Sequence, residues 1–550
     1  MMNTLKGGQW LLVLLLALWG VQIAYAQPPA DSEFLSTLGE LREASFPDKE
    51  SIVERLTKSA HPSVRMVLSA FMDERLYFRN DDQKIVIVKS TEGDPPTLVL
   101  IDPLTLKESG SAPVDSLTKI VTNNGLRRML RTTIARFGLS SPDASVRVQA
   151  VNDMLTSLDE STIALLQERL PVETDSRVKK AIAIGMSLAD LESPEDAKRL
   201  AAIDVLRSSI SQDVRNKMAD VVEQSAQGGP AANEAIHKAA SSAILTIDRW
   251  RTFYSGIETL FFGLSLGSVL VLIAVGLAIT FGVMGVINMA HGELMMLGAY
   301  TTYVVQTAMP NHIGISVLVA IPAAFIVSGL TGMLIERTII RFLYGRPLET
   351  LLATFGVSLI LQQLVRSIFS ALNRAVVTPD WMSGTLQLNE ALSLTYNRLY
   401  IVLFSLVVFA AIMLVLKRTR LGLDIRAVAQ NRTMARAMGI RSEWVDVMTF
   451  GLGSGIAGVA GVALSQVTNV GPNLGQSYII DSFMVVVFGG VGNLWGALIG
   501  GMSMGIVNKL LEPYSGAVLA KIFVLIALIL FIQVRPRGLF PQTGRSSENN

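Results

Sequence analysis

The sequence predicts an all-α fold: a polytopic membrane helix bundle with about eight or nine spanning or partly spanning segments, preceded by a mainly helical, HEAT-like soluble domain with a small β-hairpin. Half of the 550 residues are hydrophobic and 17% are charged, whereas about 25% are charged in ordinary soluble proteins. Charged residues are frequent between residues 27 and 250, and long uncharged runs follow from residue 257. We therefore expect three parts, at residues 1–26, 27–250 and 257–540.

The first 26 residues have the pattern of a secretory signal peptide. Lys6 precedes a short apolar core, LLVLLLALWG, and the small residues of AYA end at Ala26. A basic start, an apolar core and a small-x-small site are typical of a cleaved signal. A retained anchor helix is the alternative, although the core is short for a membrane span of roughly 20 residues.

A weak repeat runs through the soluble domain. Each copy has a polar turn, a Val-Arg or Arg-Val-Lys sequence and then an amphipathic helix. The copies begin near His61, Ser141, Glu173 and Ser209. In the last three copies Val146, Val178 and Val214 lie 32 and 36 residues apart, which suits paired-helix units that resemble HEAT repeats. Such a domain would offer a docking surface; the alternative is a helical domain whose similarity arose by chance.

The segment between the first and second copies predicts a β-hairpin. Its sequence, KIVIVKSTEGDPPTLVLIDPLTL, places β-branched runs on both sides of a Gly-Asp-Pro-Pro turn. Turn residues flanked by such runs are typical of two paired strands.

The membrane region consists of successive uncharged stretches. These are Thr259–Gly292, Leu294–Ile335, Thr350–Val365, Leu399–Leu416, Val447–Ile480, Ser482–Asn508 and Ile522–Val534. A spanning helix needs roughly 20 apolar residues, so several of these runs hold more than one segment. Near the C-terminus, Gly489, Gly490 and Gly492 interrupt a run, which predicts two short helices that meet at a break.

Basic residues predict the orientation, because they concentrate on cytoplasmic loops. They gather in ERTIIRFLYGRP, in the loop from Lys417 to Arg441 and in VRPRGLF near the C-terminus. Three spans between the soluble domain and the first of these loops place that domain outside the cytoplasm, as the signal peptide does. We expect a multi-pass protein of the bacterial inner membrane with its N-terminal domain in the periplasm.

Several classes of site are excluded by composition. The chain has no cysteine, so it has no disulfide, thiol nucleophile or cysteine metal ligand. Its four histidines are scattered, which argues against a metal site, and no Gly-Lys pair forms a P-loop. The net charge of +2 gives no indication of nucleic-acid binding. We expect no metal, no cofactor and no enzymatic activity of its own.

The loop from Lys417 to Arg441 predicts a cytoplasmic amphipathic helix. LDIRAVAQNRTMARAMG is rich in helix-forming residues between Gly422 and Gly439. We expect its apolar side chains on one face, with basic side chains elsewhere; the apolar ones are Ile425, Val428, Ala435 and Met438. Such a helix either docks a partner or lies on the lipid surface.

Five stretches in order resemble the permeases of branched-chain amino acid ABC transporters, the LivH type. They are GLAITFGVMGVINMAHGELMMLGAY, LLATFGVSLILQ, RLGLDIRAVAQNRTMARAMGI, SYIIDSFMVVVFGGVGNLWGALIGG and RPRGLF. The resemblance covers about residues 257–540. The long secreted helical domain and VVVFGGVGNLWG resemble one branch of the family, the urea transporter permeases.

The resemblance implies a transport subunit with separate partners. These would be a second homologous permease subunit, two cytoplasmic ATPase subunits that hydrolyse ATP and a periplasmic substrate-binding protein. It also implies that the cytoplasmic loop couples to the ATPases, with Asp424, Arg426, Gln430, Ala435, Met438 and Gly439 as candidate residues. The loop has RAVAQ where the most familiar coupling loops begin with Glu-Ala-Ala, so the loop as a whole is carried over, without individual roles.

Polar side chains inside the uncharged runs are candidates for the substrate pathway. They are Asn288, His291, Glu293, Thr354, Ser358, Gln362, Asp481 and Asn493. A carboxylate at mid-membrane costs roughly 2.5–3.5 kcal/mol, so it normally faces the bundle interior or water. Neutral hydrogen-bonding groups favour urea as the cargo of an ATP-driven importer. The alternatives are a permease for branched-chain or other amino acids and a passive urea channel. For Asn288, His291 and Glu293 the alternative is a structural role at the cytoplasmic membrane surface, with Glu293 solvated or capping a helix.

Overall fold

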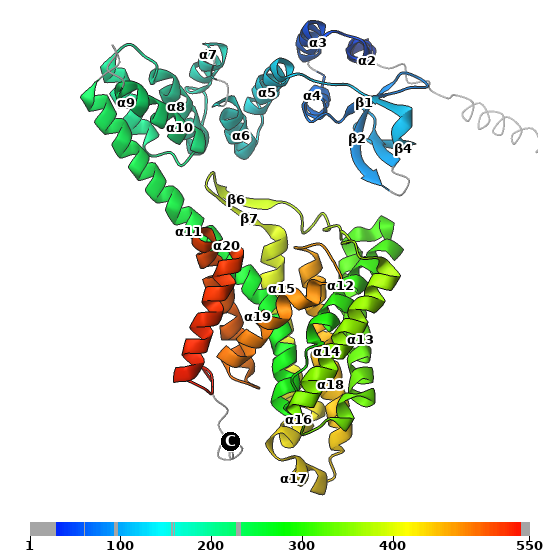
Figure 1. Ribbon diagram of the computed structural model, residues 1–550. Coiled ribbons are helices and arrows are strands. Elements are labelled where there is room, and N and C mark those ends of the chain that lie inside the picture. The colour runs from blue at the N-terminus through cyan, green and yellow to red at the C-terminus, as the bar shows by residue number, and fades with distance from the viewer. Residues whose placement is uncertain are drawn as a thin grey trace, which may run out of the picture. The chain divides into compact units, whose positions relative to one another are not determined.

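The computed structural model describes residues 29–59, 61–92, 97–155, 158, 160–226 and 233–540. The predicted signal peptide lies outside the described residues. The chain forms two compact units, Met1–Ile247 and Asp248–Asn550 (Figure 1). This boundary falls next to the end of the predicted soluble domain.

The N-terminal unit begins with three helices and a sheet. The helices are α2 (Pro29–Gly39), α3 (Phe46–Lys58) and α4 (Val64–Met72), with the short η1 (Glu40–Arg42) after α2. The strands are β1 (Leu76–Arg79), β2 (Ile85–Glu92), β3 (Thr97–Ile101), β4 (Glu108–Pro113) and β5 (Leu117–Lys119), with η2 (Val114–Ser116) between the last two.

The five strands form one antiparallel sheet in the order β4-β3-β2-β1-β5. Strands β2 and β3 are the predicted hairpin, so that prediction is confirmed. The sequence did not predict the other three strands. β1 and β5 are short, and β4 has the sequence ESGSAP, which lacks the β-branched and aromatic residues that mark a strand.

Helices fill the rest of the N-terminal unit. They are α5 (Asn124–Leu139), α6 (Ala144–Leu155), α7 (Glu160–Arg169), α8 (Ser176–Asp190), α9 (Asp196–Leu206), α10 (Gln212–Ala226) and the start of α11 (Glu234–Met284). The predicted repeat helices coincide with α4, α6, α8 and α10. Val178 and Val214 are fully buried, whereas Val146 is half-buried, so the repeat marks residues that anchor α8 and α10 to their neighbours.

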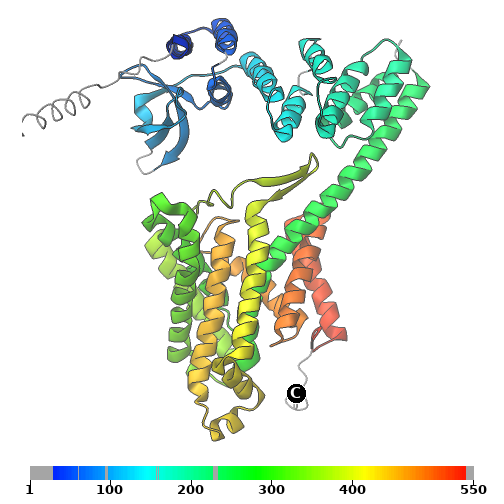
Figure 2. The same cartoon turned by 180° about the vertical axis from the view of Figure 1, so that it is seen from behind.

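The membrane unit contains the remainder of α11 and a series of further helices. They are α12 (His291–Ala308), α13 (Ile313–Thr338), α14 (Pro347–Phe369), α15 (Tyr396–Arg418), α16 (Arg420–Gln430), α17 (Arg432–Ala437), α18 (Ser442–Ser465), α19 (Leu474–Gly489) and α20 (Leu494–Val534). The short η3 (Pro310–His312) and η4 (Ile340–Phe342) flank α13. A hairpin of β6 (Thr385–Asn389) and β7 (Leu392–Thr395) precedes α15 (Figure 2).

Six of the described helices are long and apolar enough to cross a membrane: α11, α13 with its flanking turns, α14, α15, α18 and α20. The backbone of α20 is non-helical at Gly516, shortly after Pro513, so α20 consists of two segments. Adding the shorter α12 and α19 agrees with the eight or nine spanning or partly spanning segments that the sequence predicts.

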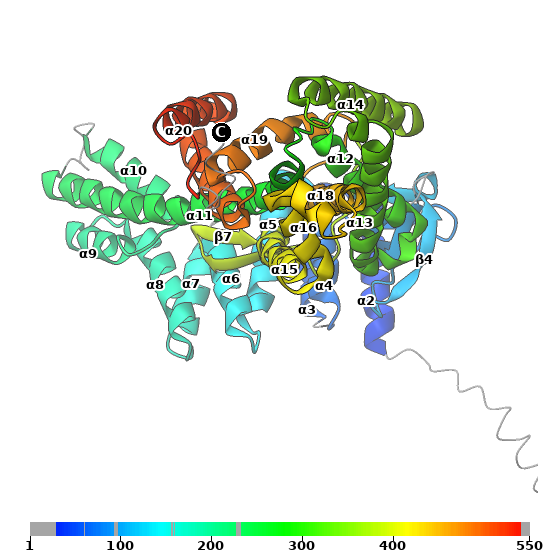
Figure 3. The ribbon, with the colours of Figure 1, turned by 90° about the horizontal axis from the view of Figure 1, so that it is seen from below.

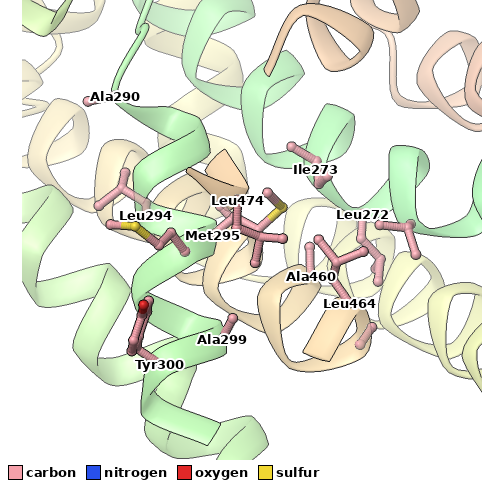
Figure 4. Packing of buried hydrophobic residues seen from close by; sticks show 14 of the residues in the cluster. Leu272, Ile273, Ala290, Leu294, Met295, Ala299, Tyr300, Ala460, Leu464 and Leu474 are labelled. Carbon is pink, nitrogen blue, oxygen red and sulfur yellow. The ribbon is translucent and has the colours of Figure 1, made fainter. Parts of the chain in front are cut away.

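Close helix packing organises the centre of this unit. Helix α18 lies against α12, α13 and α16 (Figure 3). A Cβ atom at Gly298 of α12 would collide with the backbone of Gly458 on α18, and a Cβ atom at Gly458 would collide with Ala324 and Ser328 of α13, so these two glycines allow α18 to approach both helices closely. Buried apolar side chains of α11, α12, α18 and α19, among them Leu272, Leu294, Met295, Leu464 and Leu474, fill the same core (Figure 4).

The predicted break between α19 and α20 is confirmed. Gly490 and Gly492 have φ values of 102° and 77°, a left-handed region that favours glycine. The segment after α20 folds back onto this break. The Leu539 N–H donates to the Phe488 carbonyl at 2.9 Å, and the Phe540 N–H donates to the Gly489 carbonyl at 3.1 Å.

Candidate functional site

The polar sequence NMAHGEL lies where the chain turns from α11 into α12. Gly285 has a φ of 64°, which lets the backbone leave α11 sharply. The Asn288 Oδ1 accepts a hydrogen bond from the Ala290 N–H at 3.0 Å and so satisfies one donor at the turn. Asn288 and His291 are completely buried. The glycine-rich break thus brings polar groups into the interior of the unit.

Glu293 lies in the first turn of α12, and only 1% of its surface is exposed. Its Oε1 accepts hydrogen bonds from the Gln362 Nε2 at 2.7 Å and the Ser358 Oγ at 3.1 Å. Its Oε2 has no hydrogen-bond partner among the described residues. This buried position excludes the solvated surface position that the sequence left open for Glu293.

One face of α14 supplies the partners of this turn. Thr354, Ser358 and Gln362 are spaced by four residues, which places them on one side of a helix. All three are buried. The Thr354 Oγ accepts a hydrogen bond from the Met289 N–H at 3.1 Å. The structure therefore joins Glu293 to Ser358 and Gln362, and it joins Thr354 to the backbone on both sides of Asn288; we call these five residues the Glu293 cluster.

His291 has a different partner. Its Nε2 lies 3.1 Å from the carbonyl oxygen of Ile273 on α11. Because a carbonyl only accepts, this nitrogen carries the proton. The ring also lies against Gly276, where a Cβ atom would approach the His291 Cε1 to 3.0 Å. His291 therefore ties α12 to α11, and no hydrogen bond among the described residues joins it to Glu293.

Asp481 and Asn493 form their hydrogen bonds with residues outside the Glu293 cluster. The Asp481 Oδ2 pairs with the Lys521 Nζ of α20 at 2.9 Å. The Asn493 Oδ1 caps α20 by accepting from the Trp495 and Gly496 N–H groups at 3.0 and 3.2 Å. The sequence analysis missed Lys521 as a partner, although this lysine separates two uncharged runs and needs a counter-charge there.

The loop from Lys417 to Arg441 differs from the single helix that the sequence predicts. It forms two helices, α16 and α17, which are divided at Asn431. The Asn431 backbone is extended, and its Oδ1 accepts from the Met434 N–H at 2.9 Å. This side chain therefore ends one helix and caps the next, as Asn does at helix starts.

The prediction that Ala435 and Met438 share a face is wrong. Ala435 is 5% exposed and packs with Ile425, Val428 and Val445, whereas Met438 is 77% exposed. The division at Asn431 changes the register, because the 3.6-residue period does not continue through a non-helical residue. Leu423, Met434 and Met438 are the large exposed apolar side chains of the loop, and we call them the loop apolar patch.

The remaining candidate residues of the loop have mixed positions. Arg426 and Gln430 are exposed, and Asp424 is half-buried. The Arg426 guanidinium donates to the Leu416 carbonyl at the end of α15. Gly439 has a φ of 87° and lets the chain leave α17, a role that favours glycine.

Sequence reasoning missed an ionic network that attaches the loop to the membrane helices. Arg432 of α17 donates to both oxygens of the fully buried Asp446 of α18, at 2.6 and 2.9 Å. Its guanidinium lies 5.2 Å from the centre of the Tyr344 ring, and the Tyr344 hydroxyl donates to Glu336 at 2.7 Å. The available signal was the position of Glu336 and Asp446 at the ends of two uncharged runs.

Comparisons with known proteins fit this architecture. Residues 259–533 match the model of a family described as the branched-chain amino acid transport system / permease component. The chain is 30% identical to the branched-chain amino acid permease protein BraD of Pseudomonas aeruginosa over 295 residues, which are 52% of this chain and 96% of that protein. The LivH protein of Escherichia coli K12 is also 30% identical, over 52% of this chain and 94% of its own.

A less similar relative is named for the import of a sugar. The ribose import permease RbsC of Escherichia coli K12 is 25% identical over 50% of this chain and 85% of its own length. No solved structure matches the chain. The family match begins at residue 259, so the N-terminal unit lies outside it.

Proposed function

Because the chain belongs to the family of permease components of branched-chain amino acid transport systems, we propose that it is the transmembrane subunit of an ATP-driven importer. The observation that carries this proposal is a family match that extends over nearly the whole length of a known permease. The partners in this assembly are a second homologous permease, cytoplasmic ATPases and a periplasmic substrate-binding protein. The chain spans the inner membrane, with its N-terminal unit in the periplasm.

The Glu293 cluster is our candidate for part of the translocation path. A carboxylate costs roughly 2.5–3.5 kcal/mol at the centre of a bilayer and is retained where it has a function. The unpaired Glu293 Oε2 is an acceptor, and the Asn288 Nδ2, which also lacks a described partner, is a donor. A cargo with N–H groups and oxygen acceptors would satisfy both atoms.

A branched-chain amino acid is the first candidate cargo. The relatives named for branched-chain amino acids support it, and the free carboxylate oxygen of Glu293 suits an α-ammonium group. The carboxylate of such a cargo needs a donor; Asn288 offers a neutral one, since Lys521 is already paired with Asp481.

Urea is the second candidate, and a different observation favours it. Apart from Glu293, the cluster contains only neutral hydrogen-bonding side chains, which suit a small uncharged molecule with several donors and one acceptor. The test is uptake of labelled leucine and labelled urea by cells that lack this chain and by cells in which it is restored. Restored leucine uptake alone supports the first cargo, and restored urea uptake alone supports the second. Uptake of neither would contradict both cargo assignments.

The loop apolar patch is our candidate surface for the ATPase. Exposed Leu and Met side chains at the cytoplasmic end of a bundle are costly in water, and a protein partner would cover them. Met438→Glu should therefore reduce co-purification of the ATPase while the chain still inserts normally. Lys417→Glu, a charge change at an exposed position outside the patch, serves as the control. Equal recovery of ATPase with both variants would contradict the docking surface.

The predicted topology can be tested independently of the cargo. A reporter that is active only in the periplasm should be active when fused at Gly228 and silent when fused at Gln430. The reverse pattern would contradict the proposed orientation.

Deletion of residues 31–245 with the signal retained should leave an inserted permease with reduced uptake, which would assign the N-terminal unit a role in transport.

A further inference from the structure

A basic pocket lies beside α17 and the start of α18; Figure 1 shows α16 and α17 at one end of the membrane unit. It has a volume of about 710 Å³ and lies between the end of α13, the end of α17 and the start of α18. The charged side chains that line it are Arg337, Arg436, Arg441 and Glu443. Three guanidinium groups and one carboxylate leave the pocket with an excess of positive charge.

The arginines of this pocket are available to a ligand. Arg337 and Arg441 are exposed, and neither takes part in an ion pair among the described residues. Arg436 donates through its Nε to the Ser442 Oγ at 2.6 Å, which fixes the direction of its guanidinium. Guanidinium groups bind phosphate through paired N–H donors. The pocket therefore suits a phosphate group.

A line of apolar side chains leads along α13 to the same pocket. Ile326, Leu330 and Leu334 are exposed. The steps from Ile326 through Leu330 and Leu334 to Arg337 are four, four and three residues. Residues at these intervals lie on one face of a helix. Within a membrane this face meets acyl chains, and Arg337 marks the level at which a headgroup begins.

Trp444 adds a second indication of the membrane surface. It lines the pocket from the first turn of α18, and its side chain is exposed. Tryptophan is enriched at the level of lipid headgroups, because its ring is apolar and its N–H is polar. An exposed Trp beside unpaired arginines is therefore expected where a lipid, rather than bulk water, occupies the pocket.

We propose that this pocket binds the phosphate of an anionic phospholipid, whose acyl chains lie along Ile326, Leu330 and Leu334. The acyl path is the reason for choosing a lipid over free phosphate or an acidic segment of a protein partner. Basic pockets between helices on the cytoplasmic side of membrane proteins bind such headgroups. The proposal depends on membrane insertion and is independent of the transported cargo.

The test compares three forms of the full-length chain in nanodiscs with equal amounts of phosphatidylglycerol and phosphatidylcholine. They are the unchanged chain, the double variant Arg337→Gln/Arg441→Gln and the control Arg418→Gln/Arg420→Gln. The control removes the same charge from exposed positions of the same cytoplasmic region outside the pocket. After mild detergent extraction, mass spectrometry counts the lipids that remain bound.

We expect the unchanged chain and the control to retain phosphatidylglycerol selectively. In the pocket variant, its affinity should fall about thirtyfold, equivalent to about 2 kcal/mol, because each basic side chain contributes about 1 kcal/mol near an anionic surface. Equal retention by all three forms would overturn the proposal. Displacement of the lipid by inorganic phosphate at matching concentration would overturn it in favour of free phosphate as the ligand.

Discussion

Two buried glutamates, Glu173 in the N-terminal unit and Glu293 in the membrane unit, differ in the number and charge of their hydrogen-bond donors. Glu173 of the N-terminal unit is 2% exposed. The Arg147 Nε and Nη2 each donate to it at 2.9 Å, Arg169 donates at 3.2 Å, and the Thr174 and Asp175 N–H groups donate at 2.9 and 3.0 Å. The hydrogen bonds from Arg147 are the largest cause that lowers the pKa of Glu173 to about 2.

Glu293 of the membrane unit is equally buried but has only two neutral donors, and one of its oxygens has no described partner. An isolated buried charge is costly unless it is paired, and Glu173 meets that requirement fully. Glu293 does not meet it. The difference indicates a structural role for Glu173, whereas the open oxygen of Glu293 is what a transient ligand requires.

The largest effect is expected from Glu173→Leu. This change leaves Arg147 buried without its partner, and breaking a buried pair costs about 3–5 kcal/mol. Thermal unfolding and limited proteolysis of the N-terminal unit should both show the loss. The control is Glu168→Leu on α7, the helix that precedes Glu173, because Glu168 is exposed. Equal stability of the two variants would mean that Arg147 and Glu173 are not coupled.

A third buried carboxylate sharpens the comparison. Asp446 lies in the membrane unit, but its two hydrogen bonds from Arg432 resemble those of Glu173. Asp446→Leu should therefore release α17 and reduce recovery of the ATPase, at a cost of about 1.5–3 kcal/mol for a hydrogen bond to a charged group. Protease accessibility of the loop measures the release. Glu443→Leu, at an exposed position, should leave the loop protected, and equal cleavage of both variants would contradict this.

A smaller effect is expected from acid. Folding lowers the pKa of Glu173 from an ordinary value of 4.5 to about 2, so the unfolded chain takes up the proton first. The stability from this group is complete above about pH 5 and is lost as the pH falls toward about 2. The N-terminal unit should therefore lose less stability between pH 5 and 2 in Glu173→Gln than in the unchanged chain. Parallel pH curves for the two forms would contradict the assignment.

The sequence predicts the features that depend on long or regular patterns. The uncharged runs indicate the spans, Gly489, Gly490 and Gly492 indicate the break between α19 and α20, and the repeat indicates α6, α8 and α10. These features depend only on the residues within one short stretch of the chain, so the sequence alone is enough to predict them.

Pairings between distant residues were not predictable in the same way. Nothing beside Asp446 in the sequence specifies Arg432, and nothing beside Asp481 specifies Lys521 forty residues later. The prediction of a single helix in the loop from Lys417 to Arg441 was wrong for a local reason. Asn431 divides the loop into two helices, and this division places Ala435 in the interior. Asp481 is paired with Lys521 and Asn493 caps α20, so both have structural partners, and their place in the substrate pathway stays a prediction.

The central claim is that Glu293 and its neutral partners form part of the path of an ATP-driven permease. Its most direct test is the initial uptake rate of the restored cargo in Glu293→Leu and Glu293→Gln, each corrected for the amount of inserted chain. We predict about a tenfold lower rate for Glu293→Leu, because it leaves Ser358 and Gln362 unpaired at a cost of about 1–3 kcal/mol, and a smaller decrease for Glu293→Gln. A normal rate in Glu293→Leu would contradict the claim.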